Sequence, residues 1–209
     1  MSSRPILWDV DTQVDFMLPE GKLHVPGAEQ VRAAMARLVR AAHEAGIVHV
    51  ASADDHELTD PEISDEPDFE NTYPPHCLRG TRGAHKIPET EQHDPLPLSL
   101  TPYPPGLLPG LVRGHREILL LKKNYSVFTN PNTEPLLAAL DPAEIVVFGV
   151  ATDVCDHAAI MGFVQRGLKV AFVEDAARGL DEERVAACTT SWRERGVRFT
   201  TTDAIVAGL

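Results

Sequence analysis

A cysteine, an acid and a lysine occur in this sequence where they could act together on a carbonyl group. Cys155 follows an apolar run that ends at Gly149 and precedes a helical pattern, so it stands at a strand-to-helix junction. Backbone N–H groups at a helix N-terminus lower the pKa of a thiol and can donate to an oxyanion. A nearby ammonium favours the thiolate, and a carboxylate can accept the thiol proton. By position alone, Cys155 suits a nucleophile and a packed core residue equally well.

The other two cysteines have poorer settings for catalysis. Cys188 lies in an amphipathic helical stretch beside Ala186 and Ala187, where a small buried hydrophobic residue is the expected role. Cys77 adjoins His76 and could be a metal ligand or a packed thiol. Three cysteines do not make a disulfide framework, and in a reducing compartment a lone cysteine can serve as a nucleophile. The sequence has no pattern of a membrane span or of a secretory signal, so we expect a cytoplasmic location.

An alternation of short apolar runs and helical stretches predicts how the reactive residues are positioned. We expect strands at 5–8, 47–51, 118–121, 145–149, 170–173 and 198–201, and helices near 28–45, 134–140, 153–166 and 182–195. A strand followed by a helix and another strand favours a right-handed crossover and parallel pairing. The sequence therefore predicts an α/β fold, a three-layer α/β/α doubly wound, six-stranded, mostly parallel sheet in a single domain spanning residues 1–209.

The carboxyl ends of these strands carry most of the side chains that can do chemistry. Active sites of open α/β sheets lie beyond those ends. The residues delivered there, strand by strand, are Asp9, Asp11 and Asp15; Asp54 and His56; Lys122 and Lys123; and Thr152, Asp153 and Cys155. Spacing alone does not choose among the three acids of the first strand.

Residues 54–116 interrupt the alternation with many prolines, acids and histidines. A connection of this length is unusual in a compact domain unless it is functional or disordered. The density of possible metal ligands in its first third favours a function. The repeated prolines of 88–109 predict an irregular surface excursion there.

The composition limits the classes of partner. The chain has 209 residues, 43% of them hydrophobic, and a net charge of −12 that is spread along the sequence. This charge argues against binding to nucleic acid or to an anionic membrane surface. No apolar run approaches the roughly 18 residues that a membrane span requires, and the N-terminus lacks a secretory signal pattern. We expect a small-molecule substrate.

Three segments resemble the isochorismatase-like cysteine hydrolases, and within them the nicotinamidases or pyrazinamidases. Residues 11–16, Asp-Thr-Gln-Val-Asp-Phe, resemble the Asp-x-Gln-x-Asp-Phe signature, which implies that Asp11 is the catalytic carboxylate. Residues 122–128 are similar to the Lys-x-x-Tyr-Ser-x-Phe segment and imply a catalytic Lys122. Residues 149–155 resemble the nucleophile loop. That resemblance implies Cys155 as the nucleophile, a cis peptide before Ala151, and an oxyanion hole formed by the N–H groups of Ala151 and Cys155.

Two further segments resemble the metal-binding part of nicotinamidases. Residues 54–56 match its Asp-x-His motif, and residues 73–81 resemble Trp-Pro-Pro-His-Cys-x-x-Gly-Thr. The resemblance implies one divalent metal ion on Asp54, His56 and His76, with Glu62 in the place of another histidine. Carboxylate and imidazole ligands suit zinc, iron or manganese, and we expect zinc. The candidate substrate-binding residues are Phe16, Tyr73, which replaces the usual tryptophan, Tyr125 and Ala151. For Phe16 and Tyr125, a core position is the alternative.

The resemblance implies a metal-dependent amidohydrolase, most specifically a nicotinamidase. Such an enzyme converts nicotinamide and water to nicotinate and ammonia through a cysteine thioester, and also acts on pyrazinamide. One alternative is a cysteine amidohydrolase of the same group that acts on a carbamoyl or ureido substrate. Another is a catalytically silent relative that works by binding. Since family members are often dimers or tetramers, we expect a homo-oligomer.

Several other polar residues are expected to have structural roles. Asp15 should hydrogen-bond the loop after the first strand, and Asp9 should be a structural polar group. Asp153 is predicted to cap the following helix. His157 is predicted to be a surface residue of that helix.

Overall fold

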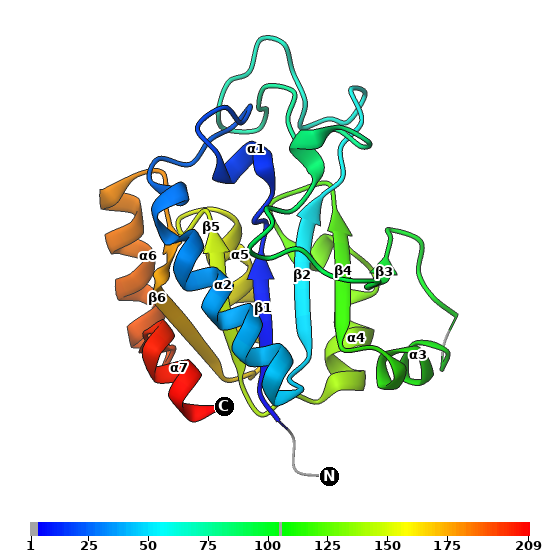
Figure 1. The fold of residues 1–209 in the computed structure, drawn as a ribbon. Coiled ribbons are helices and arrows are strands. Elements are labelled where there is room, and N and C mark those ends of the chain that lie inside the picture. The colour runs from blue at the N-terminus through cyan, green and yellow to red at the C-terminus, as the bar shows by residue number, and fades with distance from the viewer. Residues whose placement is uncertain (1–3, 105) are drawn as a thin grey trace.

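A seven-stranded sheet lies between two layers of helices in the computed structural model, which describes residues 4–104 and 106–209 (Figure 1). The spatial order is β3-β4-β2-β1-β5-β6-β7, and every pair among the described residues is parallel. The strands are β1 (Ile6–Val10), β2 (His49–Asp54), β3 (Leu96–Leu98), β4 (Glu117–Lys122), β5 (Ile145–Val150), β6 (Val170–Arg178) and β7 (Arg198–Thr200). The predicted doubly wound α/β fold is confirmed, with one strand more than expected.

Helices cover both faces of this sheet and divide the core into two halves. The helices are α1 (Val14–Met17), α2 (Ala28–Ala45), α3 (Leu108–Gly114), α4 (Thr133–Leu140), α5 (Cys155–Gln165), α6 (Glu182–Glu194) and α7 (Thr202–Gly208), with 3-10 turns η1 (Arg82–Ala84) and η2 (Val127–Thr129). The α1, α2 and α7 helices contribute to the apolar cluster on one face, and α3 to α6 contribute to the cluster on the other. Burial on both faces explains why the central strands read as continuous apolar runs.

The long helix α2 follows directly from its sequence pattern. Val31, Met35 and Leu38 recur at helical spacing and are buried against the sheet. Gly46 ends the helix in a left-handed conformation with φ of 65°, and its N–H bonds back to the last turn. The predicted bounds of this helix are confirmed.

The expected irregular excursion at 88–109 is partly wrong, because it contains the edge strand β3. Leu96 and Leu98 are buried and pair in parallel register with Ile118 and Leu120 of β4. The strand is only three residues long and has a central Pro97, which suits an edge position but hides the strand from pattern recognition. The start of α3 also falls within this range.

A glycine lets β1 and β5 end side by side. Gly149 has a φ of +139°, and a Cβ placed on it would lie 2.2 Å from the carbonyl oxygen of Val10. A side chain cannot be accommodated at that distance, so glycine is required. The close approach brings the residue after β1, Asp11, next to the loop that follows β5.

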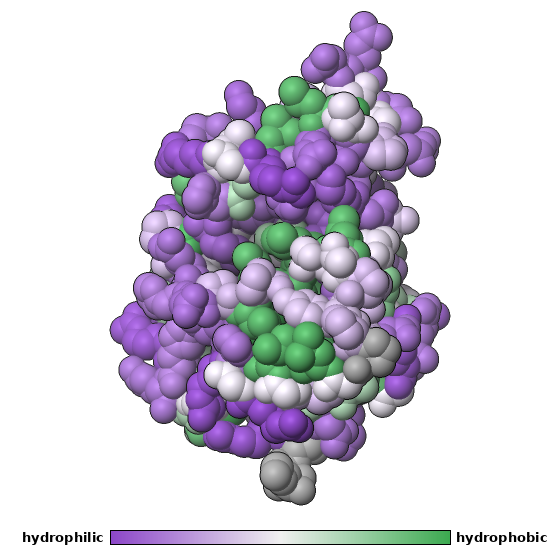
Figure 2. Space-filling view, turned by 90° about the vertical axis from the view of Figure 1, so that its right-hand side faces the viewer, coloured by the Kyte–Doolittle hydropathy of each residue, from purple (hydrophilic) through white to green (hydrophobic). Residues whose placement is uncertain are grey.

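The segment from about 55 to 95 crosses the carboxyl ends of the strands, toward which the arrowheads of β1, β2 and β4 point in Figure 1. Within the described residues, no helix has the length and apolar character needed to cross a membrane. Figure 2 shows separate hydrophobic patches on one side of an otherwise hydrophilic surface. The homo-oligomer stays a prediction.

Candidate active site

The ammonium group of Lys122, at the end of β4, lies among the predicted catalytic residues. Its Nζ atom is 2.8 Å from Asp11 Oδ2, 2.5 Å from Asp54 Oδ1 and 3.9 Å from Cys155 Sγ. Lys122 is completely buried, as is Asp11. Three segments that are distant in the sequence therefore bring an acid, a lysine and a cysteine together at the carboxyl edge of the sheet.

Asp11 is held in place by its neighbour on β2. The Ser52 hydroxyl donates to Asp11 Oδ1 at 2.8 Å, and the Asp11 N–H donates to the Ser52 carbonyl. Asp11 has a φ of 50°, a left-handed conformation that few non-glycine residues adopt. The chain turns sharply there, immediately after β1, and the turn directs the carboxylate toward Lys122.

The electrostatics of this group favour a protonated thiol and a charged lysine. Burial opposes the charge of Lys122, but the carboxylates of Asp11 and Asp54 outweigh it, so the lysine pKa lies well above its usual value. Burial raises the pKa of the Cys155 thiol well above its ordinary value, and Asp11 and Asp54 add to the effect. Burial likewise raises the pKa of Asp11. The expected lowering of the Cys155 pKa is wrong, because burial outweighs the helix N-terminus and Lys122.

The loop after β5 presents Cys155 together with two backbone donors. The Val150–Ala151 peptide bond is cis, as the resemblance implies. Cys155 begins α5, and Ala151 and Cys155 both line a pocket. Within residues 4–104 and 106–209, no acceptor is found for the N–H of Ala151 or of Cys155. Two N–H groups beside the sulfur are suited to bind an oxyanion.

Asp54 also faces a pair of histidines, so it connects Lys122 to a possible metal site. Its Oδ2 atom is 3.8 Å from His56 Nε2 and 3.8 Å from His76 Nε2, and the three residues are buried. One ligand atom from each lies within 4.8 Å of the others. Zinc, iron and manganese accept such a set of two imidazoles and a carboxylate.

The outer nitrogens of both histidines have acceptors that fix the rings. His76 Nδ1 lies 2.8 Å from the Pro74 carbonyl oxygen, and His56 Nδ1 lies 3.4 Å from Asp60 Oδ2. Such partners select the tautomer and leave Nε2 free to bind a metal. The Nε2 atom of His56 is buried without a hydrogen-bond partner among the described residues. These side chains therefore fit a divalent metal ion.

Glu62 and the predicted substrate-binding residues surround the same pocket. Its lining residues include Phe16, Tyr73, Tyr125, Ala151, Asp54, Glu62, His76 and Cys155. One oxygen of Glu62 is buried without a hydrogen-bond partner among the described residues, although Glu62 is outside the three-residue group. The ring centroid of Phe16 lies 5.4 Å and that of Tyr73 6.3 Å from the ring of His76. Tyr125 is half exposed at the pocket rim.

Gln13 is a positioning residue that the sequence reasoning missed. Its side-chain amide donates to the Asp54 carbonyl at 2.8 Å and accepts from the Asp54 N–H at 2.7 Å. The same amide donates to the carbonyl of Ala84. Gln13 thus ties the end of β2 to the segments on either side. Its place in the Asp-x-Gln-x-Asp-Phe signature was the available signal.

Asp60 is a second missed residue. It accepts from Lys123 Nζ at 2.7 Å in addition to its contact with His56. Lys123, predicted to be only a neighbour of the catalytic lysine, therefore anchors the carboxylate that orients a candidate metal ligand. Asp60 is the fourth residue after His56, but nothing in the sequence indicates that the loop folds back between them.

The polar residues expected to be structural have mixed outcomes. The Asp15 carboxylate accepts from the N–H groups of Lys22 and Cys77, which confirms its role in holding the loop. Asp153 accepts from the Leu180 N–H and caps no helix, so that prediction is wrong. The surface prediction for His157 is wrong too, because its ring is half-buried and accepts from Trp192 Nε1 at 3.0 Å.

The two remaining cysteines are distinct from the site. Cys77 is fully buried, and its thiol points to the Gly83 carbonyl at 3.9 Å, so it is a packed thiol rather than a metal ligand. Cys188 packs at the border of the apolar cluster on the α3 to α6 face. Cys155 is the cysteine that meets Lys122.

The fold and site correspond to a known family. Residues 6–204 match the isochorismatase domain, which is nearly the entire chain. The chain therefore belongs to the isochorismatase domain family.

The chain is similar to individual nicotinamidases or pyrazinamidases and to one other amidase. A nicotinamidase/pyrazinamidase of Mycobacterium tuberculosis (strain ATCC 25618 / H37Rv) is 29% identical over 197 residues, which cover 91% of this chain and 95% of the relative. The pyrazinamidase of Pyrococcus horikoshii, solved in complex with zinc, superposes with a TM-score of 0.74 at 22% identity, covering 95% of this chain and 99% of that one. An N-carbamoylsarcosine amidase from Thermoplasma acidophilum gives a TM-score of 0.72 at 20% identity, with coverages of 96% and 97%.

Proposed function

We propose that this protein is a nicotinamidase, a hydrolase of the amide carbon–nitrogen bond that converts nicotinamide and water to nicotinate and ammonia. Pyrazinamide, which carries the same carboxamide on a related ring, would be a second substrate. The observation that carries the proposal is the double contact of Asp54, with Lys122 on one oxygen and with His56 and His76 on the other. Asp54 thereby connects Lys122, which lies beside the Cys155 thiol, to the two histidines beside which a heteroaromatic ring could bind.

In the first half of the reaction, Asp11 accepts the thiol proton and Cys155 Sγ attacks the carboxamide carbon. The ammonium of Lys122 stabilises the negative charge that the sulfur gains as the proton moves to Asp11. The N–H groups of Ala151 and Cys155 donate to the developing oxyanion. Asp11 then gives its proton to the amide nitrogen, the carbon–nitrogen bond breaks, and ammonia leaves. The acyl group remains as a thioester on Cys155.

In the second half, the same residues act on water. Asp11 takes a proton from water, and the resulting hydroxide adds to the thioester carbon. The carbon–sulfur bond breaks, the acid is released, and the proton on Asp11 returns to the sulfur. Burial raises the pKa of both Asp11 and Cys155, so the proton lies on the sulfur at rest and passes to Asp11 only as the sulfur attacks.

The substrate ring would occupy the pocket between Phe16, Tyr73 and the histidines. Asp54, His56 and His76 would hold one divalent metal ion, zinc in our expectation, and Glu62 would complete the set. Such an ion supplies a Lewis-acidic position for the ring nitrogen, directly or through water. The aromatic walls would exclude water and orient the carboxamide toward the sulfur.

A second candidate is a related cysteine amidohydrolase that acts on a carbamoyl or ureido substrate. The similarity of the fold to N-carbamoylsarcosine amidase supports it. The paired histidines beside Asp54 favour the nicotinamidase.

Ammonia release decides between the two. Purified protein should be supplied in parallel with nicotinamide, pyrazinamide, benzamide and N-carbamoylsarcosine, before and after chelation. The proposal expects nicotinamide and pyrazinamide to be hydrolysed in a metal-dependent manner and benzamide, which lacks a ring nitrogen, to be poor. Preference for N-carbamoylsarcosine with no effect of chelation would overturn it.

A further inference from the structure

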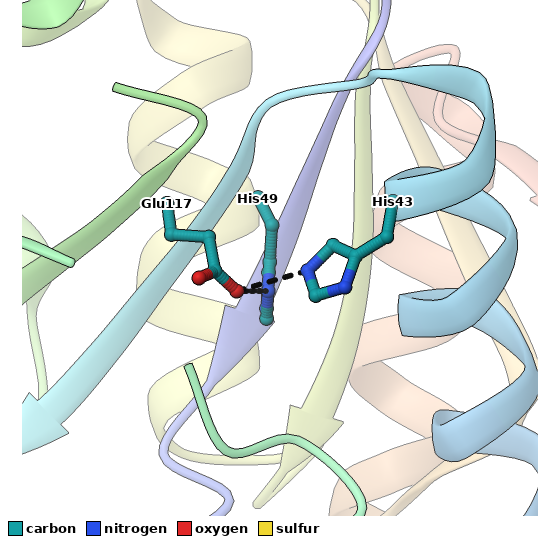
Figure 3. A group of neighbouring side chains, drawn as sticks. All are labelled: His43, His49 and Glu117. Atoms are coloured by element: carbon teal, nitrogen blue, oxygen red, sulfur yellow. Dashed lines mark ion pairs between the residues drawn. The ribbon is translucent and has the colours of Figure 1, made fainter. Parts of the chain in front are cut away.

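Two histidines and a glutamate converge at the amino-terminal end of β2 and β4, outside the site described above. Figure 3 shows His43 from the last turn of α2, His49 from the first residue of β2 and Glu117 from the first residue of β4. His43 Nε2 lies 2.9 Å and His49 Nδ1 lies 4.0 Å from the same oxygen, Glu117 Oε1. One ligand atom from each residue lies within 4.8 Å of the others.

Two of these three residues, His49 and Glu117, have buried polar atoms without the partners that burial requires. His49 is fully buried, and neither of its ring nitrogens makes a hydrogen bond within the described residues. Glu117 Oε1 is buried and likewise without a hydrogen bond there, although His43 is near, because the geometry is unsuitable. Native proteins rarely leave buried polar atoms unpaired unless an ion or water completes them.

A carboxylate is ready to orient the buried histidine. Asp9 Oδ2 lies 3.5 Å from His49 Nε2, on the opposite side of the ring from Glu117. Asp9 is in turn held by Lys86 Nζ at 2.8 Å and by the Thr12 hydroxyl at 3.1 Å. Metal-bound histidines commonly donate their outer N–H to a carboxylate in this way.

The negative charge of the cluster also favours the binding of a cation. Lys86 balances Asp9, which leaves the carboxylate of Glu117 uncompensated when the histidines are neutral. Within the described residues, no lysine or arginine forms an ion pair with Glu117. The other oxygen of Glu117 accepts from the His93 N–H at 2.7 Å, which fixes the carboxylate and leaves Oε1 directed at the imidazoles.

We propose that His43, His49 and Glu117 form a second divalent-metal site, for zinc or a similar transition metal. The ligands of a tetrahedral zinc ion are spaced by about 3.3 Å. The two measured separations, 2.9 and 4.0 Å, lie on either side of that value. His43 is partly exposed, which gives the ion a route of entry and leaves a coordination position for water. The ion would tie the end of α2 to the start of two central strands.

This site is separate from the pocket. The two ends of β2, His49 and Asp54, are five residue steps apart, which corresponds to about 16 Å of extended chain. Replacement of His43 should therefore leave amide hydrolysis unchanged in metal-saturated protein.

Metal stoichiometry tests the proposal. The full chain, stripped with a chelator, should be titrated with zinc chloride alone by calorimetry, and cobalt chloride should be used to record ligand-field absorption. The variants are His43→Ala and Glu117→Gln, which alter partly exposed residues. His85→Ala, an exposed histidine outside both groups, is the matched control. Circular dichroism verifies that each variant folds.

The proposal expects His43→Ala and Glu117→Gln each to lose one zinc equivalent, or to bind it at least tenfold more weakly, while His85→Ala binds as the parent does. Equal stoichiometry and affinity in the parent and both variants would overturn it. A His76→Ala variant distinguishes the two sites, because it should lose the pocket's equivalent and keep this one. Failure of the pocket to bind metal would therefore count against the proposed function alone.

Discussion

Each end of the β2–β4 pair carries an acidic and a basic side chain, but the charge of the carboxylate is compensated differently at the two ends. At the carboxyl end, Asp54 and Lys122 lie in register and form a direct ion pair, with Asp11 on the other side of the ammonium. At the amino end, His49 and Glu117 lie in register, and within the described residues only histidines, no lysine or arginine, pair with the carboxylate. At the carboxyl end, Lys122 balances the carboxylates. At the amino end, the side chains are of the kinds that bind a metal cation.

This difference shows how burial sets the chemistry of each end. A lysine between two carboxylates keeps its charge without water, because the attraction of both anions outweighs desolvation. The sulfur beside it is then protonated at rest and ionises only as the proton moves to Asp11. The carboxylate of Glu117 faces two imidazoles and, within the described residues, has no lysine or arginine to compensate its charge in this way.

The largest expected effect comes from removing the sulfur. Cys155→Ala should reduce amide hydrolysis at the carboxyl end by about 10⁴-fold or more, because no other group can form the acyl intermediate. Cys188→Ala, at the border of a core cluster, should retain activity. Ammonia release and circular dichroism measure the two effects. Substantial turnover by a folded Cys155→Ala variant would refute the assignment.

The next prediction compares the two ends directly. Lys122→Met leaves two buried carboxylates without their cation, so unfolding free energy should fall by about 3–5 kcal/mol along with activity. Glu117→Gln, in the metal-free chain, should change it by less than about 1 kcal/mol, since the ion-pair partner of that carboxylate, His43, is partly exposed. Urea denaturation followed by circular dichroism measures both. Similar losses of unfolding free energy in both variants would contradict the difference in charge compensation between the two ends.

A smaller effect concerns the support of His56. Asp60→Asn removes the carboxylate behind the ring, and metal affinity of the pocket should fall by about 10–100-fold with the fold retained. Asp65→Asn, an exposed change in the same loop, is the control. Competition with a chromophoric chelator measures the affinity. Unchanged affinity in Asp60→Asn would exclude a supporting role for this residue.

The smallest effect, taken per pH unit, is a dependence of stability on pH that arises next to the nucleophile. Asp156 is buried, and neither carboxylate oxygen has a hydrogen-bond partner among the described residues. Burial, with the negative charges of Asp11, Asp9 and Asp153, raises the pKa of Asp156 well above 3.8, while Thr152 opposes the shift.

The sign of that dependence follows from proton uptake. Above the unfolded pKa, near 3.8, the unfolded chain has released the proton that folded Asp156 keeps, so stability from this group falls as pH rises toward the folded pKa. Asp156→Asn cannot ionise. Between pH 5 and pH 8 its unfolding free energy should therefore decline less than that of the parent, by at most about 1.4 kcal/mol per pH unit. Parallel pH profiles would show that Asp156 is ionised in the folded protein.

Most of the fold could be predicted from the sequence because its strands and long helices have strong periodic patterns. The α2 helix and β5 are examples, each with apolar residues at the spacing that the structure buries. The β3 strand could not be recognised, because three residues with a central proline show no strand pattern and form a strand only by pairing with β4.

The site was predictable to the extent that its residues lie in short motifs. The meeting of Asp11, Lys122 and Cys155 followed from strand ends and from family resemblance. The direction of the Cys155 pKa did not, because it depends on burial, which a motif does not report. The roles of Gln13 and Asp60 depend on tertiary contacts; the family signature marked the position of Gln13 but not its contact with Asp54, and no local pattern marked Asp60.

Acid quenching of the protein during turnover of nicotinamide tests the central chemistry most directly. Intact mass and peptide mapping should find a nicotinoyl group on the peptide that contains Cys155, lost on incubation with hydroxylamine as a thioester would be. An acyl group on any other residue, or rapid turnover in which hydroxylamine captures no acyl group, would contradict the account.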